Sequence, residues 1–210
     1  HDFPLGTWYG PDGHGYEGDD RWAHTAAGVA TATSVWTFED LPAGWYSVSA
    51  TWHEEPVQNA STLAPYTVEA TGSPAVTTTV NQMLPPQDFT EGGVQWEDLG
   101  YPQYVPAGGT LTVTLANNAP GWFVLADAVR VEYLTAAEIV VRDATGGVDL
   151  EDGQSTVDFG PVDRGSLQTR TLEIRNYGTQ PLLLSDLSVP AGFSASGFPT
   201  VVAAAGVGTY

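Results

Sequence analysis

Cysteine and lysine are both absent from the 210-residue sequence, and basic side chains are few. Without cysteine the chain has no disulfide, no thiolate nucleophile and no cysteine-based zinc or iron–sulfur site. Six arginines stand against 25 acidic residues, giving a net charge of −19. A surface of this sign repels the phosphates of nucleic acids and of anionic membranes. No apolar run approaches the ~18 residues of a membrane-spanning helix. We therefore expect no nucleic-acid partner and no membrane insertion.

The residues that are present favour strands and turns. Hydrophobic residues make up 42% of the chain, enough for a packed core, and 24 glycines and 15 prolines favour turns over helices. Apolar and polar side chains alternate along residues 45–52, and this pattern places Tyr46, Val48, Ala50 and Trp52 on one face of a strand. The same alternation of apolar and polar residues occurs over 110–115, and the pattern over 123–133 predicts a longer strand. The pattern predicts an antiparallel, all-β sandwich.

Composition divides the chain in two. All seven tryptophans precede residue 123. Residues 1–137 carry 16 acidic residues and two arginines, whereas residues 138–210 carry nine acidic residues and four arginines. We expect a first domain over 1–134, a linker over 135–137 and a second all-β domain over 138–210. In the second domain we expect strands at 138–142, 156–160, 169–175 and 182–189. Because the chain begins with His1, we expect a processed product or a fragment.

Most of residues 6–134 resembles a known family, the golvesin C-terminal-like domain, which is also found attached to xanthan lyases and other secreted bacterial proteins. The matching segments are 36–38, 41–52, 64–68, 80–82, 96–100, 109–115 and 126–131, in the family's order. The resemblance implies a jelly-roll-like β-sandwich with a sugar-binding or adhesive role, in an extracellular or cell-surface setting. It implies no established ligand or catalytic residue.

The second domain resembles the start of a choice-of-anchor D, or ASH/Hydin-type, immunoglobulin-like domain. The matching segments are 155–162, 165–166, 169–171, 174–182 and 191–193. Such domains are spacers and docking modules, but this sequence stops at Tyr210, where the later strands should begin. We therefore expect an incomplete immunoglobulin-like β-sandwich. A half-built sandwich lacks part of its inner layer, which leaves four side chains without a complete partner layer: Leu172, Ile174, Leu182 and Leu184. Either the sequence is a window cut from a longer polypeptide, or a neighbouring chain supplies the strands.

Two groups of carboxylates are candidate ligands for a cation. Asp127 falls on the inward face of its strand, where an unpaired charge costs several kcal/mol. It either accepts backbone N–H groups from a neighbouring loop or binds Ca²⁺. Four more acids, Asp12, Glu17, Asp19 and Asp20, lie in the glycine-rich run 10–20. Oxygen ligands on a loop suit Ca²⁺, although the spacing fails the EF-hand pattern and a solvated acidic loop is the alternative. We expect no other cofactor.

Aromatic and amide side chains give two further candidates. Trp8, Trp22, Trp45 and Trp122 border turns or lie in irregular segments, so they are candidates for stacking on sugar rings, with ordinary packing as the alternative. Trp36 and Trp52 lie on strands and are expected in the core. Asn59 begins the one N-glycosylation sequon.

Catalytic patterns are missing from the sequence. The four histidines are scattered, and no nucleophile elbow, zinc-protease motif or phosphate loop is present. We therefore expect no enzyme. The favoured hypothesis is a secreted structural or adhesive module of a filament-like surface assembly, completed by strands from a neighbouring chain through self-association or contact with other β-domains. The alternative is a carbohydrate-binding appendage, with glycans as ligands, of a larger polysaccharide-active enzyme.

Overall fold

The computed structural model describes residues 2–11, 13–53, 59–150, 155–205 and 207–209, and these form two compact units. Unit 1 comprises residues 1–133 and unit 2 residues 134–210. As the sequence predicts, the chain is almost entirely β, built from antiparallel sheets. Within the described ranges the only helical element is the short 3₁₀ turn η1 (Tyr16–Gly18), and no helix there is long and apolar enough to cross a membrane.

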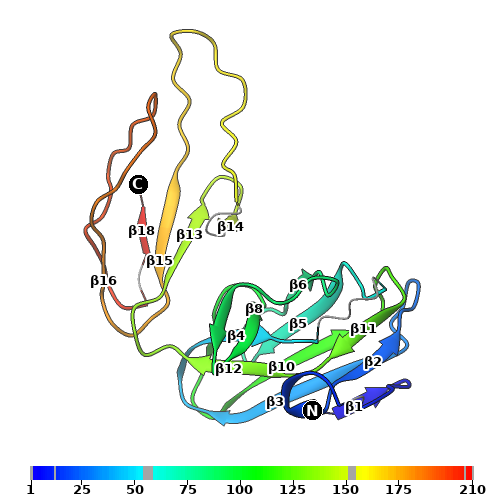
Figure 1. Cartoon of the computed structure of the whole chain (residues 1–210). Helices are drawn as coiled ribbons and strands as arrows, with labels where there is room; N and C mark the ends of the chain where they lie inside the picture. The colour runs from blue at the N-terminus through cyan, green and yellow to red at the C-terminus, as the bar shows by residue number, and fades with distance from the viewer. Residues whose placement is uncertain (1, 12, 54–58, 151–154, 206, 210) are drawn as a thin grey trace. The chain divides into compact units, whose positions relative to one another are not determined.

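Unit 1 contains two five-stranded sheets and one strand pair (Figure 1). The first sheet has the order β1 (Asp2–Leu5), β3 (Thr33–Leu41), β10 (Gly109–Ala116), β5 (Ala64–Ala70) and β6 (Val76–Val80). The second has the order β12 (Val129–Tyr133), β4 (Gly44–Ala50), β8 (Val94–Asp98) and β7 (Phe89–Glu91), with β9 (Gln103–Val105) also paired to β4. The pair joins β11 (Phe123–Ala126) to β2 (Arg21–His24).

Alternation along the strands builds the core of unit 1. On β10, Leu111, Val113 and Leu115 are fully buried, and Val113 lies opposite Trp36 on β3 and Val68 on β5. The inward residues of β4 belong to the same buried cluster, so the two large sheets share one core. Each fully buried Val or Leu contributes about 1.5–3 kcal/mol. The alternation predicted for 45–52 and 110–115 is thus confirmed, and Trp36 and Trp52 are core residues as expected.

The single long strand predicted over 123–133 is wrong, because the segment forms two strands. β11 pairs with β2 and β12 pairs with β4, and the break falls at Asp127 and Ala128. At this point the chain passes from one sheet to another, and the Ala128 carbonyl accepts a hydrogen bond from Thr51 N–H at 3.0 Å. Sequence alternation continues across the break, so periodicity alone does not reveal it.

A glutamine side chain takes the place of a strand beside β11. The Gln82 amide donates to the Leu125 carbonyl at 2.7 Å and accepts the Leu125 N–H at 2.9 Å. Both Gln82 and Leu125 are buried. These Leu125 groups point away from β2, since Gln82 and not β2 binds them. Gln82 therefore satisfies a strand edge that would otherwise be buried without partners.

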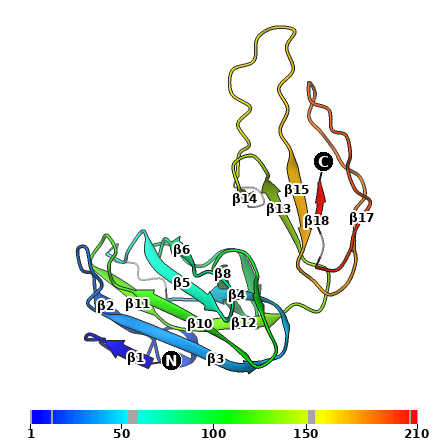
Figure 2. The same cartoon turned by 180° about the vertical axis from the view of Figure 1, so that it is seen from behind.

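Unit 2 has one four-stranded sheet, in the order β14 (Val148–Leu150), β13 (Ile139–Asp143), β15 (Leu172–Asn176) and β18 (Val207–Thr209). A second pair joins β16 (Leu182–Leu183) to β17 (Val201–Val202). The strand predicted at 156–160 is absent, β15 begins only at residue 172, and β16 covers two of the eight residues predicted for its strand. Residues 155–171 and 184–200 instead form long loops that extend beyond the sheet (Figures 1 and 2). A strand needs a hydrogen-bonding neighbour, and neither loop pairs with a strand.

Asn176 ties together the chain segments of unit 2. Its Oδ1 accepts the N–H groups of Glu138 and Gly178, at 3.1 and 3.0 Å, and its Nδ2 donates to the Gln180 carbonyl at 2.7 Å. The Nδ2 also lies within hydrogen-bond distance of the Val202 carbonyl. Asn176 itself is buried, and its bonds to Gly178 and Val202 are shielded from water.

The segment predicted as a linker, 135–137, makes contacts inside unit 2. Thr179 Oγ1 donates to the Thr135 carbonyl at 2.6 Å. A Cβ placed on Gly178 would stand 1.6 Å from the Ala136 oxygen, so the two backbones are in direct contact there.

Candidate functional site

A glycine-rich loop, residues 10–18, packs against one buried carboxylate. Gly15 has φ +73°, a conformation that favours glycine. A Cβ at this position would also stand 2.5 Å from Asp127 Oδ2 and 2.9 Å from Asp20 Cβ. Glycine is therefore required at residue 15 both by its backbone angle and by the close approach of the loop to Asp127.

Asp127 occupies the break between β11 and β12 and is 2% exposed. Both of its carboxylate oxygens accept the Tyr16 backbone N–H, at 3.0 and 2.8 Å. Burial raises the pKa of this carboxyl to about 7; the Tyr16 N–H opposes the rise, and the charges of Asp20 and Asp19 add to it. The carboxylate thus has the backbone partner that one of the two sequence interpretations requires.

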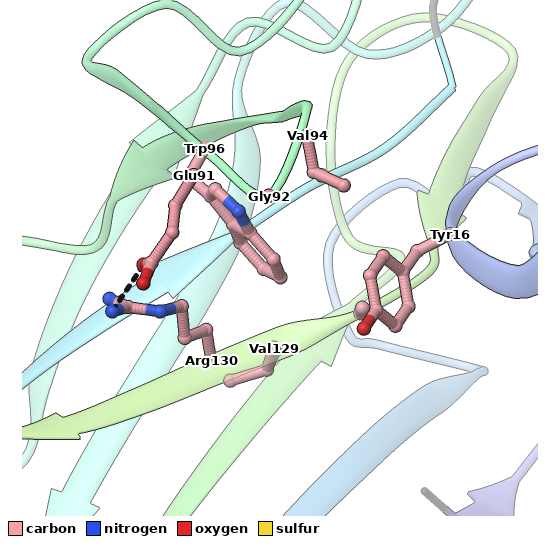
Figure 3. Close-up of a pocket in the computed structure, with 8 residues that line it drawn as sticks. Tyr16, Glu91, Gly92, Val94, Trp96, Val129 and Arg130 are labelled. Carbon is pink, nitrogen blue, oxygen red and sulfur yellow. Dashed lines mark ion pairs between the residues drawn. The ribbon is translucent and has the colours of Figure 1, made fainter.

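Tyr16 lines two neighbouring hollows. The first has a volume of about 400 Å³ and is lined by Tyr16, Val94, Trp96, Val129 and Arg130, with Glu91, Gly92 and Ala128 (Figure 3). The Tyr16 and Trp96 ring centroids are 6.0 Å apart. The second has a volume of about 390 Å³, and its lining includes Trp52, His53, Gln95 and Asp127. Tyr16 and Val94 line both hollows, so the two are neighbouring parts of one surface.

Charged side chains form the rim of the first hollow. Arg130 makes an ion pair with Glu91 (Figure 3) and a second one with Glu132 at 2.9 Å, and its guanidinium lies 5.5 Å from the centroid of the Phe89 ring. The paired carboxylates and the ring hold the arginine in place, so the rim presents both charged groups and aromatic surface.

The tryptophans proposed for sugar stacking lie outside both hollows and do not form one cluster. Trp8 donates its indole N–H to the Thr33 carbonyl at 3.1 Å, Trp22 stacks on Tyr9 with ring centroids 4.4 Å apart, and Trp45 meets the edge of Tyr104 at 5.5 Å. Trp122 is 69% exposed.

Tyr16, Val94 and Trp96 line the hollows instead, and sequence reasoning did not select them. The one signal available was an aromatic residue, Tyr16, inside an acidic glycine-rich loop.

The acidic residues proposed as calcium ligands are only partly brought together. Asp20 is buried and close to Asp127, whereas Glu17 and Asp19 are exposed; Asp12 lies outside the described residues. Among the residues that the structure describes, no group of three or more His, Asp or Glu side chains is arranged to hold a metal ion. The sequence-based set therefore reduces to one close pair, Asp20 and Asp127.

The sequon at Asn59 is fixed in the fold. The Asn59 carbonyl accepts the Trp122 N–H at 2.9 Å. Ser61, the sequon hydroxyl residue, is fully buried, and its Oγ accepts the Leu63 N–H at 3.1 Å. Glycosylation of Asn59 stays a prediction.

The sheet of unit 2 has one apolar face. Cross-strand register places Val141 opposite both Leu150 and Ile174, and places Val148 and Leu172 opposite the same residue of β13, Asp143. Residues directly opposite each other point to the same side of a sheet. We call this side the apolar face; its apolar residues are Ile139, Val141, Val148, Leu150, Leu172 and Ile174, and Asp143 and Asn176 share the same side. The other side carries ion pairs, including Arg142 with Asp149 at 3.5 Å.

The apolar face is only partly covered. Ile139 and Val148 are 45% and 60% exposed, Val141, Leu150 and Leu172 are half-buried, and only Ile174 is buried. Of the four residues proposed for assembly, Leu172 and Ile174 thus lie on this face. Leu182 and Leu184 are half-buried in and just after β16. Ile174 already packs within unit 2, whereas Ile139 and Val148 leave more apolar surface open to water.

Comparison with known proteins identifies the first unit. No curated protein and no solved structure matches the chain. The model of the Golvesin C-terminal domain family matches residues 3–133, more than half of the chain, and the match ends where unit 1 ends. The Golvesin C-terminal domain is an accessory, non-catalytic domain associated with secreted proteins. The immunoglobulin-like assignment of residues 138–210 stays a prediction. The chain belongs to the Golvesin C-terminal domain family.

Proposed function

We propose that this chain is a non-catalytic structural module of an extracellular or cell-surface assembly, in which the apolar face of unit 2 packs against a neighbouring copy. The observation that carries the proposal is the open face itself. Soluble proteins cover such contiguous apolar surface or use it for binding. Within the described part of unit 2, the buried apolar side chains are Leu134, Ile174, Tyr177 and Val202. That core is small for a unit of this length.

Two further features support a neighbouring copy as the partner. The sheet ends on both sides in three-residue strands, β14 and β18, and among the described residues no further strand pairs with their outer edges, which a strand from another copy could use. Unit 2 carries nine acidic residues and four arginines, a net charge of −5, against −14 for unit 1. Repulsion between copies is therefore weakest where unit 2 meets unit 2, which favours a filament-like arrangement joined through these units.

The experiment is sedimentation velocity of the purified chain over a range of concentrations. We expect the mass to rise above 22.2 kDa with concentration, and Val148→Asp to abolish the rise by placing a charge on the apolar face. Val29→Asp is the matched control, because Val29 is 84% exposed but lies in unit 1. A mass that stays at one chain for the wild type, or an association that Val148→Asp leaves intact, would refute the proposal.

Carbohydrate binding is a second candidate function, supported by the two hollows beside Tyr16. Aromatic rings with nearby polar groups are the usual surface for binding sugar rings, and Trp96, Arg130 and Gln95 stand beside Tyr16 in these hollows. Tyr16→Ala should abolish binding of the chain to a glycan array. Tyr9→Ala is the matched control and should keep the binding, because Tyr9 is 42% exposed and Tyr16 40% but Tyr9 lies outside the hollows. The same array should show whether Trp45→Ala or Trp122→Ala lowers glycan binding. Absence of binding to every glycan would remove this candidate.

A further inference from the structure

One buried carboxylate oxygen in unit 1 has no partner. Asp20 is 4% exposed, and its Oδ1 makes no hydrogen bond within the described part of the chain. Burying an ionised carboxylate is unfavourable unless a cation or hydrogen-bond donors compensate it. The Asp20 oxygen can therefore accept a cation or a hydrogen-bond donor.

Strand register places a second carboxylate beside it. β2 and β11 are antiparallel, with Arg21 opposite Ala126 at the end of the ladder, so Asp20 and Asp127, the residues next to this last pair, lie at the same end of the strand pair. The packing at Gly15 agrees, because Asp20 Cβ and Asp127 Oδ2 both lie within 2.9 Å of one point.

The arginines of unit 1 do not neutralise this pair. Unit 1 has two arginines and no lysine. Arg130 is paired with Glu91 and Glu132. Arg21 follows Asp20 directly on the strand, so it points to the other side, and its Nη1 is itself buried without a hydrogen-bond partner.

We propose that Asp20 and Asp127 together bind Ca²⁺ beneath the glycine-rich loop. The second hollow, which Gly15 and Asp127 both line, gives the ion a route from solvent. Two carboxylates fill only part of a coordination sphere, so backbone carbonyls and water must supply the rest. Ca²⁺ accepts six to eight such oxygen ligands in flexible geometry, whereas Mg²⁺ demands a near-ideal octahedron.

The charge arrangement agrees with a cation at this position. The charges of Asp20 and Asp19 act on the Asp127 carboxylate, and a bound Ca²⁺ would offset this repulsion between neighbouring acids. With two carboxylates, we expect a dissociation constant of about 10⁻⁴–10⁻³ M, the range of extracellular modules.

The test follows thermal unfolding of the full chain by tryptophan fluorescence during a Ca²⁺ titration to about 10 mM, well above the expected dissociation constant. We expect a saturable rise of several degrees in the unfolding midpoint, and a much smaller one with Mg²⁺. Asp20→Asn and Asp127→Asn should each abolish the rise. Asp40→Asn is the control and should keep it, because Asp40 is exposed with φ +54°, a conformation that asparagine also adopts.

A second measurement does not depend on whether the variants fold. In ¹⁵N spectra of the wild type, Ca²⁺ should shift the amide of Tyr16, which donates to Asp127, together with those of Asp20 and Asp127. The proposal is overturned if no saturable change occurs, if the shifted amides lie elsewhere, or if both variants keep the rise in midpoint.

Discussion

Replacing Gln82 by leucine tests whether a side chain substitutes for a strand beside β11. Leucine has a similar size but cannot bond the backbone of Leu125, whose N–H and carbonyl would lose the contacts of 2.9 and 2.7 Å. Both groups are shielded from water, since Leu125 and Gln82 are buried. The Tyr66 hydroxyl would also lose the Gln82 amide, although it would still donate to the Leu125 carbonyl at 3.3 Å.

The magnitude follows from the two backbone groups. Leaving a buried donor or acceptor unsatisfied costs about 1–3 kcal/mol each, and the remaining Tyr66 contact reduces the cost at the carbonyl. We therefore expect Gln82→Leu to lower the free energy of unfolding of unit 1 by about 2–5 kcal/mol. Gln87→Leu is the control, because Gln87 is exposed; it should change stability by at most about 0.5 kcal/mol.

Urea denaturation followed by tryptophan fluorescence is the suitable assay. All seven tryptophans precede residue 123, so the signal reports unit 1 alone. A loss for Gln82→Leu no larger than that of the control would refute the idea that this amide completes the sheet edge.

The remaining predictions concern Asp127 and Gly178. Burial raises the pKa of Asp127 from 3.8 to about 7, so folding takes up a proton between these values; in the metal-free chain the contribution of this carboxyl to stability should be full below about pH 4 and be lost as pH rises through 7. In urea titrations across this range, Asp127→Asn should flatten the slope, and an unchanged slope would contradict the assignment. Gly178→Ala should destabilise unit 2, because its Cβ would stand 1.6 Å from the Ala136 oxygen. Trypsin cleaves this lysine-free chain only after arginine, and it should cut the Gly178→Ala variant faster at Arg175. Gly146→Ala is the control and should be cut at the wild-type rate, because its Cβ would stand 3.3 Å from the nearest atom, Asp143 Oδ2.

Much of unit 1 could be predicted from alternation, because each strand buries one face. Val48 on β4 and Val113 on β10 follow that rule. The break at Asp127 could not be predicted, since it depends on which strands lie beside β11 and β12. Sequence also cannot show that Gln82 reaches across to Leu125.

The candidate site was less predictable for a related reason. Tryptophan marks surfaces that bind sugars only when the fold exposes it in a hollow, and the hollows here form around Tyr16. Asp20 and Asp127 are 107 residues apart in sequence and become neighbours because the β2–β11 pair ends beside both of them and the Gly15 loop packs against both. In unit 2, the segments 156–160 and 185–189 had suitable residues but pair with no strand among the described residues, and Leu184 N–H alone extends the pairing of β16, to the Thr200 carbonyl.

Hydrogen exchange of the unit 2 amides, measured at low and high chain concentration, tests the assembly proposal most directly. If neighbouring copies cover the apolar face, exchange in β13, β14 and β15 should slow markedly as concentration rises, while exchange in β10 of unit 1 stays constant. Unit 2 amides that are already fully protected in dilute solution, and unchanged on concentration, would show that the unit is complete by itself and contradict the account.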